Sequence, residues 1–170
     1  LVTAGGTREP IDAVRAITNR SSGKMGFAVA AEAARRSADV ILIAGPSALP
    51  TPPGVQRVDV ETALEMREAV LAEFGPVTVA VMAAAGGDFR AADPSSRKIK
   101  KEGLAPGAGI QIELVATPDI LAEISRERGD RVVVGFAAES HEVVEAARRK
   151  LDRKGCDLMV ANDISRRDAG

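Results

Sequence analysis

The chain has no tryptophan and no tyrosine, and only four phenylalanines among its 170 residues. Because aromatic side chains are scarce, the core has to be built from Val, Ile, Leu and Ala, which suits a parallel sheet covered by helices better than a β-sandwich. Hydrophobic residues make up 45% of the chain. This content and this length predict one domain with a sizeable core.

Cysteine and histidine each occur once, as Cys156 and His141. A single cysteine excludes an internal disulfide framework and fits a reducing compartment, so we expect a cytoplasmic protein. One His and one Cys also leave no zinc ligand set and no Ser-His-Asp triad. Cys156 stands between Gly155 and an apolar run, which predicts a packed, inert thiol.

The chain also lacks an excess of one charge and a long apolar run. It carries 23 basic and 24 acidic residues, so no overall basic field indicates a nucleic-acid partner. No apolar run approaches the length of a membrane span and no signal peptide is recognisable. Because Leu1 already stands inside a strand-like run, we interpret the chain as a domain excised from a longer protein.

Short apolar runs alternate with longer amphipathic stretches. Strands are predicted at 1–6, 38–47, 55–60, 77–82, 109–115, 131–139 and 156–163, and helices at 23–36, 61–74, 117–128 and 141–155. In the third helix Thr117 is the expected N-cap and Pro118 the first helical residue. This order predicts an α/β, Rossmann-like, doubly wound and mostly parallel sheet with helices on both faces.

Glycine-rich turns and polar residues follow several of these strands. In such sheets ligands bind beyond the carboxyl ends of the strands, where we expect Gly5, Gly6, Ala84 to Asp88, Phe136 and Asn162. The loop Ser21-Ser22-Gly23 opens the first long helix, so its N–H groups could receive a phosphate. Met25 follows Lys24 where a P-loop has Ser or Thr. The alternative is that a serine merely caps the helix.

Basic residues gather in two places. Arg97 to Lys101, "RKIKK", places four cations in five residues, and is either a solvated loop or a clamp for a triphosphate. Lys150 and Lys154 are four residues apart and therefore share one helix face. They are either an exposed stripe or a pair directed at one anion.

Arg15 and Asn19 suggest a second kind of chemistry. Arg15 can fork onto a carboxylate or phosphate, and the Asn19 amide can donate to a carbonyl oxygen that gains negative charge. Asn19 could equally make an Asx-turn. Asp88 could hold a ribose hydroxyl or only shape its turn, and helix initiation is enough to explain Pro118 and Asp119.

The motifs "AGGTREPIDAVRAITNRSSGKMG", "AAxxDFR", "KIKK", "TPDIL", "VGFAAES" and "KGCDLMVAND" follow one another in this order. Together they closely resemble phosphopantothenoylcysteine synthetase, the phosphopantothenate–cysteine ligase of coenzyme A biosynthesis, over essentially the whole chain. In bacteria this family is often fused behind a flavin-dependent phosphopantothenoylcysteine decarboxylase.

The resemblance implies ligation of 4'-phosphopantothenate to L-cysteine through an acyl-cytidylate. CTP is the implied nucleotide, favoured over the ATP of some relatives by the bacterial-type "KIKK", and Mg²⁺ travels with the triphosphate. The family is dimeric, so a homodimer with sites at its interface is implied.

The family's site residues carry over by matching position. Asn19 would act on the acyl-cytidylate and Lys98 would clamp the nucleotide from a flap, while Arg15, Asn19 and Ala85 would meet phosphopantothenate. The nucleotide would meet Gly6, Ser21, Gly23, Gly26, Met82, Ala83, Ala84, Asp88, Lys98, Pro118, Asp119, Ile120, Leu121, Phe136, Lys150, Lys154 and Asn162. No protein metal ligand is implied.

Two departures from the family pattern stand out. Where the family usually has Ala-Val-Ala-Asp, this chain has Ala85-Gly86-Gly87-Asp88, which should loosen the loop by raising its backbone entropy. The family also continues beyond "VAND", so we expect residues 1–170 to be one nucleotide-binding ligase domain without the family's C-terminal part, and inactive alone if that part completes the site.

The sequence leaves two rival functions open. An NAD(P)-binding oxidoreductase is disfavoured because no G-x-G-x-x-G is present and no acidic residue ends "VILIAG" to hold a ribose. A non-catalytic nucleotide-binding module, with Asn19 and Lys98 passive, is the other.

Overall fold

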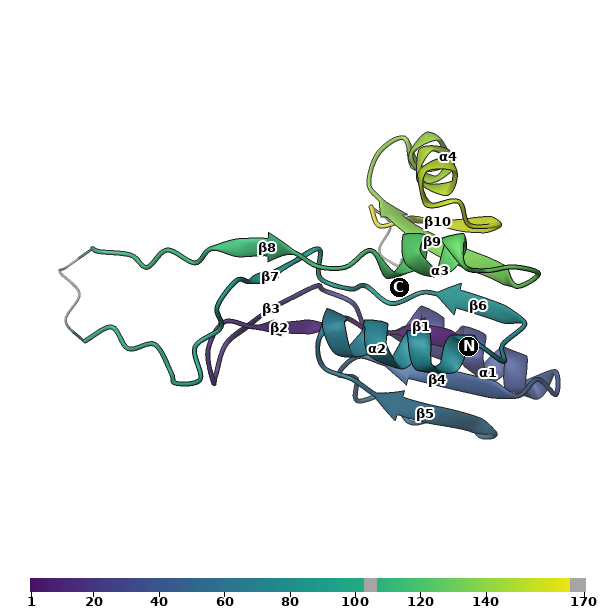
Figure 1. Cartoon of the computed structure of the whole chain (residues 1–170), viewed down its shortest axis with the longest axis horizontal. Coiled ribbons are helices and arrows are strands. Elements are labelled where there is room, and N and C mark those ends of the chain that lie inside the picture. The colour runs from purple at the N-terminus through teal and green to yellow at the C-terminus, as the bar shows by residue number, and fades with distance from the viewer. Residues whose placement is uncertain (103–106, 166–170) are drawn as a thin grey trace.

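The computed structural model describes residues 1–102 and 107–165. Its main feature is a six-stranded sheet in the order β10-β9-β6-β1-β4-β5 (Figure 1), in which every neighbouring pair is parallel. The strands are β1 (Val2–Ala4), β4 (Val40–Ala44), β5 (Val55–Asp59), β6 (Val79–Met82), β9 (Val132–Glu139) and β10 (Leu158–Asp163). The α/β, doubly wound prediction is therefore confirmed.

The four helices within the described ranges cover this sheet unequally. Helix α1 (Lys24–Arg35) buries Phe27 and Ala30 against one face of β1 and β4. Helices α2 (Ala63–Phe74), α3 (Ile120–Arg126) and α4 (Val143–Lys154) pack on the other face, where Met66 and Ile124 belong to one core cluster. The six strands all run the same way, but the order in which they are added to the sheet reverses between β1 and β6. The chain passes from β1 through α1 to β4 and β5, and then returns through α2 to β6 on the other side of β1.

Local sequence explains where the helices begin and end. Thr62 caps α2 in a capping box with Glu65, which satisfies two backbone donors reciprocally. Gly155, at φ 67°, closes α4 in the left-handed conformation that glycine tolerates best. None of the helices formed by the described residues combines the length and the apolar character needed to cross a membrane.

Half of the α1-side face of the sheet carries no helix among the described residues. The side chains of Val133 and Ala80 belong to the core on the α2 side of the sheet. Because successive side chains along a strand point to opposite faces, the residues next to them in sequence point to the α1 side. On that uncovered side Val79, Val132, Leu158 and Val160 are 42%, 39%, 58% and 40% exposed. We call these four residues the open apolar face.

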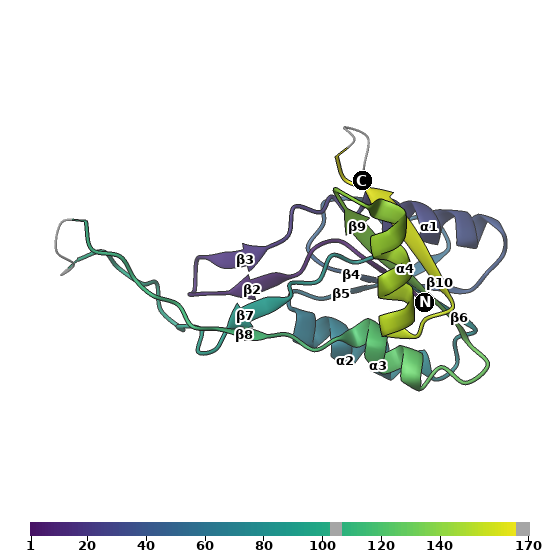
Figure 2. The ribbon, with the colours of Figure 1, turned by 90° about the horizontal axis from the view of Figure 1, so that it is seen from above.

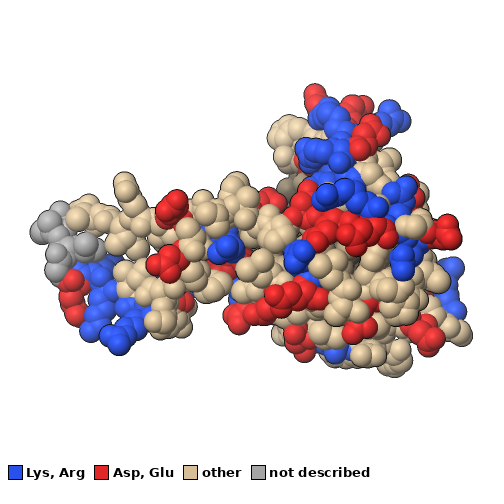
Figure 3. All heavy atoms as spheres, viewed as in Figure 1, with Lys and Arg blue, Asp and Glu red and all other residues tan. Residues whose placement is uncertain are grey.

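Two antiparallel strand pairs form an arm that extends away from the sheet (Figures 1 and 2). One pair is β2 (Arg8–Pro10) with β3 (Ala16–Thr18), and the other is β7 (Phe89–Ala91) with β8 (Leu114–Ala116). The pairs touch through β2 and β7. Figure 3 shows Lys and Arg near the outer end of the arm and over α4, with Asp and Glu spread over the body.

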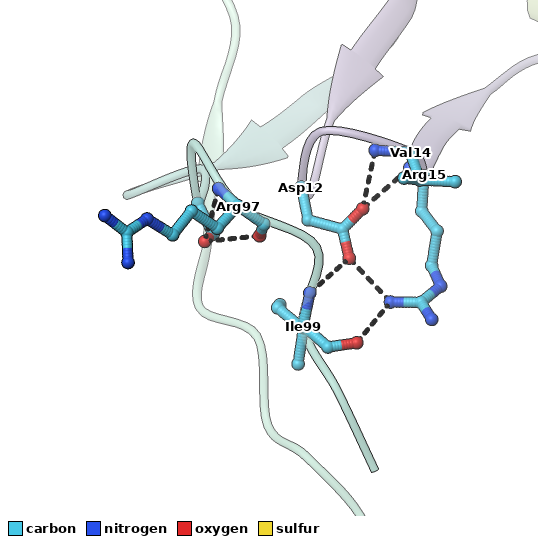
Figure 4. Close-up of polar contacts among 6 residues, drawn as sticks. Asp12, Val14, Arg15, Arg97 and Ile99 are labelled. Carbon is cyan, nitrogen blue, oxygen red and sulfur yellow. Dashed lines mark hydrogen bonds and ion pairs between the residues drawn. The ribbon is translucent and has the colours of Figure 1, made fainter. Parts of the chain in front are cut away.

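The carboxylate of Asp12 fastens the two parts of the arm together (Figure 4). Its side chain is fully buried and accepts the N–H groups of Val14, Arg15 and Ile99 at 2.8, 2.8 and 3.0 Å, together with Arg15 Nη1 at 2.5 Å. Arg15 Nη1 also donates to the carbonyl oxygen of Ile99 at 3.1 Å. Burial by itself raises the pKa of Asp12, but these bonds and the Arg15 charge outweigh it and hold the pKa below its ordinary value.

Three details differ from the sequence-based expectations. The strand expected at 109–115 is only Leu114–Ala116, because its partner β7 is three residues long. The third helix is capped by Asp119, whose carboxylate accepts Ala122 N–H at 3.1 Å, and not by Thr117. The Thr117 hydroxyl donates instead to the carbonyl of Gly87. The strands β2, β3 and β7 were not predicted.

Candidate nucleotide-binding cleft

A cleft of about 610 Å³ opens beyond the carboxyl ends of β1 and β6, where the winding of the sheet reverses. This is the place where open α/β sheets bind ligands. Its walls come from the start of α1, the 82–88 loop, the start of α3, the ends of β9 and β10, and α4. The lining residues include Asn19 to Gly26, Met82 to Asp88, Thr117 to Leu121, Phe136, Lys150, Lys154 and Asn162.

The start of α1 forms the first wall. Its N-cap is Gly23, at φ 76°, and no side chain caps the helix there. The hydroxyls of Ser21 and Ser22 instead accept the N–H groups of Gly23 and Lys24, each at 3.3 Å. A Cβ on Gly26 would lie 2.5 Å from Ala4 Cβ, so glycine lets α1 press directly on β1. Because Ser21 to Gly26 line the cleft, the N-terminus of α1, with its partial positive charge, faces it.

The 84–87 loop forms the second wall, and side chains from other segments hold its backbone. Ala84 N–H donates to Thr3 Oγ1 at 3.1 Å and Gly87 N–H to Thr7 Oγ1 at 2.8 Å. Asn19 Nδ2 donates to the carbonyl oxygens of Ala85 and Gly86 at 3.1 and 2.9 Å. Hydrogen bonds from Thr3, Thr7 and Asn19 therefore hold the loop backbone in the described structure, and the loosening expected from Gly86 and Gly87 stays a prediction.

Helix α4 supplies two ammonium groups to the third wall. Lys150 Nζ donates to the carbonyl of Phe136 at 2.7 Å, and burial, followed by the charge of Lys154, lowers the pKa of Lys150. Lys154 forms an ion pair with Asp119 at the start of α3. Burial acts to raise the pKa of Asp119, but the hydrogen bonds from Lys154 and from Ala122 N–H bring it below its ordinary value.

The cleft brings together most of the residues singled out from the sequence. Asn19, Ser21, Gly23, Gly26, Asp88, Phe136 and Asn162 line it, as do residues 82–85 and 118–121 and both α4 lysines. Gly6 lies just behind it, since a Cβ there would be 3.7 Å from Ser21 Cβ. Arg15 and Lys98 do not line it: both lie on the arm. Arg15 lines a separate apolar groove with Ile11, Ile99 and Ile110.

Sequence reasoning did not assign a ligand role to Arg20 or Lys24, although both line the cleft. Their position beside Asn19 and inside the serine loop was the available signal. With Lys150 and Lys154 they make four cations against the two carboxylates of Asp88 and Asp119, so the lining carries a net positive charge suited to an anion. Within residues 1–102 and 107–165, no three His, Cys, Asp or Glu side chains are grouped to hold a metal ion.

Comparison with known proteins agrees with this geometry. The family model of the DNA/pantothenate metabolism flavoprotein C-terminal domain matches residues 1–170. The chain is 52% identical over 171 residues to the Escherichia coli (strain K12) coenzyme A biosynthesis bifunctional protein CoaBC, covering 100% of this chain and 42% of that protein. The CoaBC of Mycolicibacterium smegmatis is 50% identical over 175 residues, covering 96% of this chain and 42% of its own length.

Solved structures give the same result. The crystal structure of the C-terminal domain of CoaBC superposes with a TM-score of 0.82 at 42% identity, over 95% of this chain and 74% of that one. A Cab2 mutant in complex with phosphopantothenate-cysteine shares the fold, with a TM-score of 0.81 at 18% identity over 96% of this chain and 71% of that one. The chain spans less than half the length of these CoaBC relatives, and it belongs to the family of DNA/pantothenate metabolism flavoprotein C-terminal domains, to which the C-terminal domain of CoaBC is similar.

Proposed function

We propose that this domain ligates 4'-phosphopantothenate to L-cysteine with CTP, in coenzyme A biosynthesis. The observation that carries the proposal is the cleft itself. It gathers a glycine-serine loop at a helix N-terminus, four cations and the amide of Asn19 beside one another. Family membership, at about half identity to CoaBC proteins, supports the same reaction.

The reaction has two steps. A carboxylate oxygen of phosphopantothenate attacks the α-phosphorus of CTP, and the bond to the leaving pyrophosphate breaks. The cysteine amine then attacks the carbonyl carbon of the acyl-cytidylate, CMP leaves and the amine proton passes to solvent. Mg²⁺ enters as part of the CTP substrate. Such chemistry requires positioning and neutralisation of charge more than an acid or base.

The residues of the cleft have separable roles in this scheme. The start of α1, with Ser21 and Gly23, would receive phosphate oxygens through N–H groups. Lys150 and Lys154 would neutralise the triphosphate. Asn19 uses its amide N–H groups on Ala85 and Gly86, so donation to the reacting carbonyl requires it to exchange one of these bonds.

A homodimer would account for Arg15 and Lys98, which lie on the arm and outside the cleft. Val14, Phe89 and Ile110 of the arm are 67%, 54% and 49% exposed, and a second copy would remove them from water. We propose that this contact brings Arg15 and Lys98 toward the cleft of the partner subunit. Fusion to a decarboxylase is proposed for the longer protein, by analogy with the bifunctional relatives.

The first test is calorimetric titration of the domain with CTP, ATP and NADPH, each with Mg²⁺. Selective CTP binding is expected. NADPH binding without CTP binding would refute the proposal in favour of an oxidoreductase. CMP release with phosphopantothenate and cysteine then separates a ligase from a passive nucleotide-binding module.

Lys98→Gln and Lys101→Gln form a matched pair for the same assay. Both lysines are in "RKIKK", so each substitution removes one charge from the same segment. We expect weaker CTP binding or slower CMP release for Lys98→Gln only. Equal effects of the two variants would assign the segment a general electrostatic role, and no effect of either would make it a solvated loop.

A further inference from the structure

The four strands of the arm meet the body of the protein at the 84–88 loop. Thr7 precedes β2, Asn19 follows β3, Asp88 precedes β7 and Thr117 follows β8. These ends are bonded to one another. Thr18 Oγ1 donates to the Thr7 carbonyl at 2.7 Å, and Thr117 N–H donates to the Asp88 carbonyl at 3.0 Å. The root of the arm and the wall of the cleft are therefore one hydrogen-bonded unit.

Gly87 is at the centre of this unit. It is buried, yet neither of its backbone polar groups bonds to a neighbouring strand. Its N–H donates to Thr7 Oγ1 at 2.8 Å, and its carbonyl accepts from Thr117 Oγ1 at 2.5 Å. A buried backbone group without a partner raises the free energy of the folded state. The hydroxyls of Thr7 and Thr117 remove this penalty for the N–H and the carbonyl of Gly87.

The orientation of the Gly87 peptide groups matters to the cleft because Asp88 follows directly and Ala85 and Gly86 precede. All three line the cleft. Gly86 and Gly87 have no side chain to restrict their dihedral angles. Close packing also limits this position, since a Cβ on Gly87 would lie 3.1 Å from Cγ of the buried Glu9.

We propose that Thr7 and Thr117 are positioning residues, which hold Gly87 from both sides and thereby orient the cleft wall for the nucleotide. Thr7 is fully buried and acts only through Gly87. Thr117 lines the cleft, and its hydroxyl donates to the Gly87 carbonyl, so the exchange rates of residues 83–88 separate its action on the loop from direct contact with the nucleotide. The part of the proposal that concerns the nucleotide rests on the proposed function, whereas the ordering of the loop does not.

The test compares Thr7→Val and Thr117→Val with Thr7→Ser and Thr117→Ser. Valine keeps nearly the same shape without the hydroxyl, and serine keeps the hydroxyl. Thr78→Val is the control, since Thr78 is exposed at the opposite end of β6. Amide hydrogen exchange is measured on fragments that cover residues 83–88, and CTP affinity by calorimetry, at a temperature where every variant is folded.

We expect the valine variants to speed exchange in 83–88 by about fivefold or more, as for the loss of one ordinary hydrogen bond, and to weaken CTP binding by a similar factor. The serine variants should restore both, and Thr78→Val should change neither. Exchange at the wild-type rate in the valine variants, or serine variants that behave like valine, would overturn the inference. If the unmodified domain fails to bind CTP, the proposed function fails, and the exchange rates still decide the role of the threonines.

Discussion

Replacing Gly26 by alanine tests the packing of α1 on β1. The new Cβ would lie 2.5 Å from Ala4 Cβ and 2.8 Å from the Thr3 carbonyl oxygen, whereas carbon atoms in contact are about 3.5–4.0 Å apart. The helix must therefore retreat by roughly 1 Å. Such overpacking costs about 1–3 kcal/mol, and alanine returns up to ~1 kcal/mol through its helix propensity. We expect a net loss of about 1–2 kcal/mol.

For a chain of this size that loss lowers Tm by about 2–8 °C, measured by circular dichroism with urea unfolding as a second probe. Gly86→Ala is the control. A Cβ there meets nothing within 4 Å and its φ lies outside the left-handed region, so stability should be unchanged or higher by about 0.4–1 kcal/mol. Gly26→Ala should also weaken CTP binding, because the start of α1 moves. An unchanged Tm for Gly26→Ala would refute the argument.

Three further predictions follow from the same structure. Gly135→Ala places a Cβ 2.7–2.9 Å from the ends of the Leu121 and Met159 side chains. Because these ends can move, we expect the free energy of unfolding to fall by only about 1 kcal/mol. A decrease in urea unfolding equal to that of Gly26→Ala would contradict this. Burial lowers the pKa of Lys150 below 10.5, so CTP affinity should fall with rising pH before an ordinary lysine titrates, and Lys150→Gln should remove that part of the pH profile in calorimetry. The pKa of Asp12 is below 3.8 in the folded protein, so the stability that its carboxylate contributes is present above pH ~3.8 and is lost as pH falls through the lower folded-state pKa. The difference in Tm between wild type and Asp12→Asn should therefore stay constant down to about pH 4 and disappear in stronger acid. A difference that disappears near neutral pH would refute the assignment.

The sheet and its helices could be predicted because their signals are local. Apolar runs of four to eight residues, as in "VILIA" and "VVVGFAA", alternate with amphipathic stretches, and this order implies a parallel sheet. The position of the cleft follows from the same topology. Glycines and lysines at strand ends and helix starts could therefore be placed near one another before any coordinates were known.

The arm could not be predicted in the same way. Its strands are three residues long, too short for a periodic pattern, and they are held by contacts between distant residues such as Asp12 and Ile99. The two hydrogen bonds that Asn19 Nδ2 donates to the carbonyl oxygens of Ala85 and Gly86 were missed for the same reason. The start of α3 was misjudged because Thr117 and Asp119 are both good N-caps, and a long-range bond to Gly87 occupies the threonine.

The open apolar face has a consequence for the order in which the walls of the cleft unfold. Strands β1 and β4 are covered by helices on both sides, whereas β9 and β10 are covered on one side among the described residues. Cooperative units with fewer buried contacts open at lower free energy. Phe136, Lys150 and Asn162 belong to the half covered once, and Ser21 to Gly26 to the half covered twice. Mild heating or dilute denaturant should therefore unfold the wall that carries Lys150 and Lys154 while the loop from Ser21 to Gly26 is still folded, so that the cleft is lost before the domain unfolds as a whole.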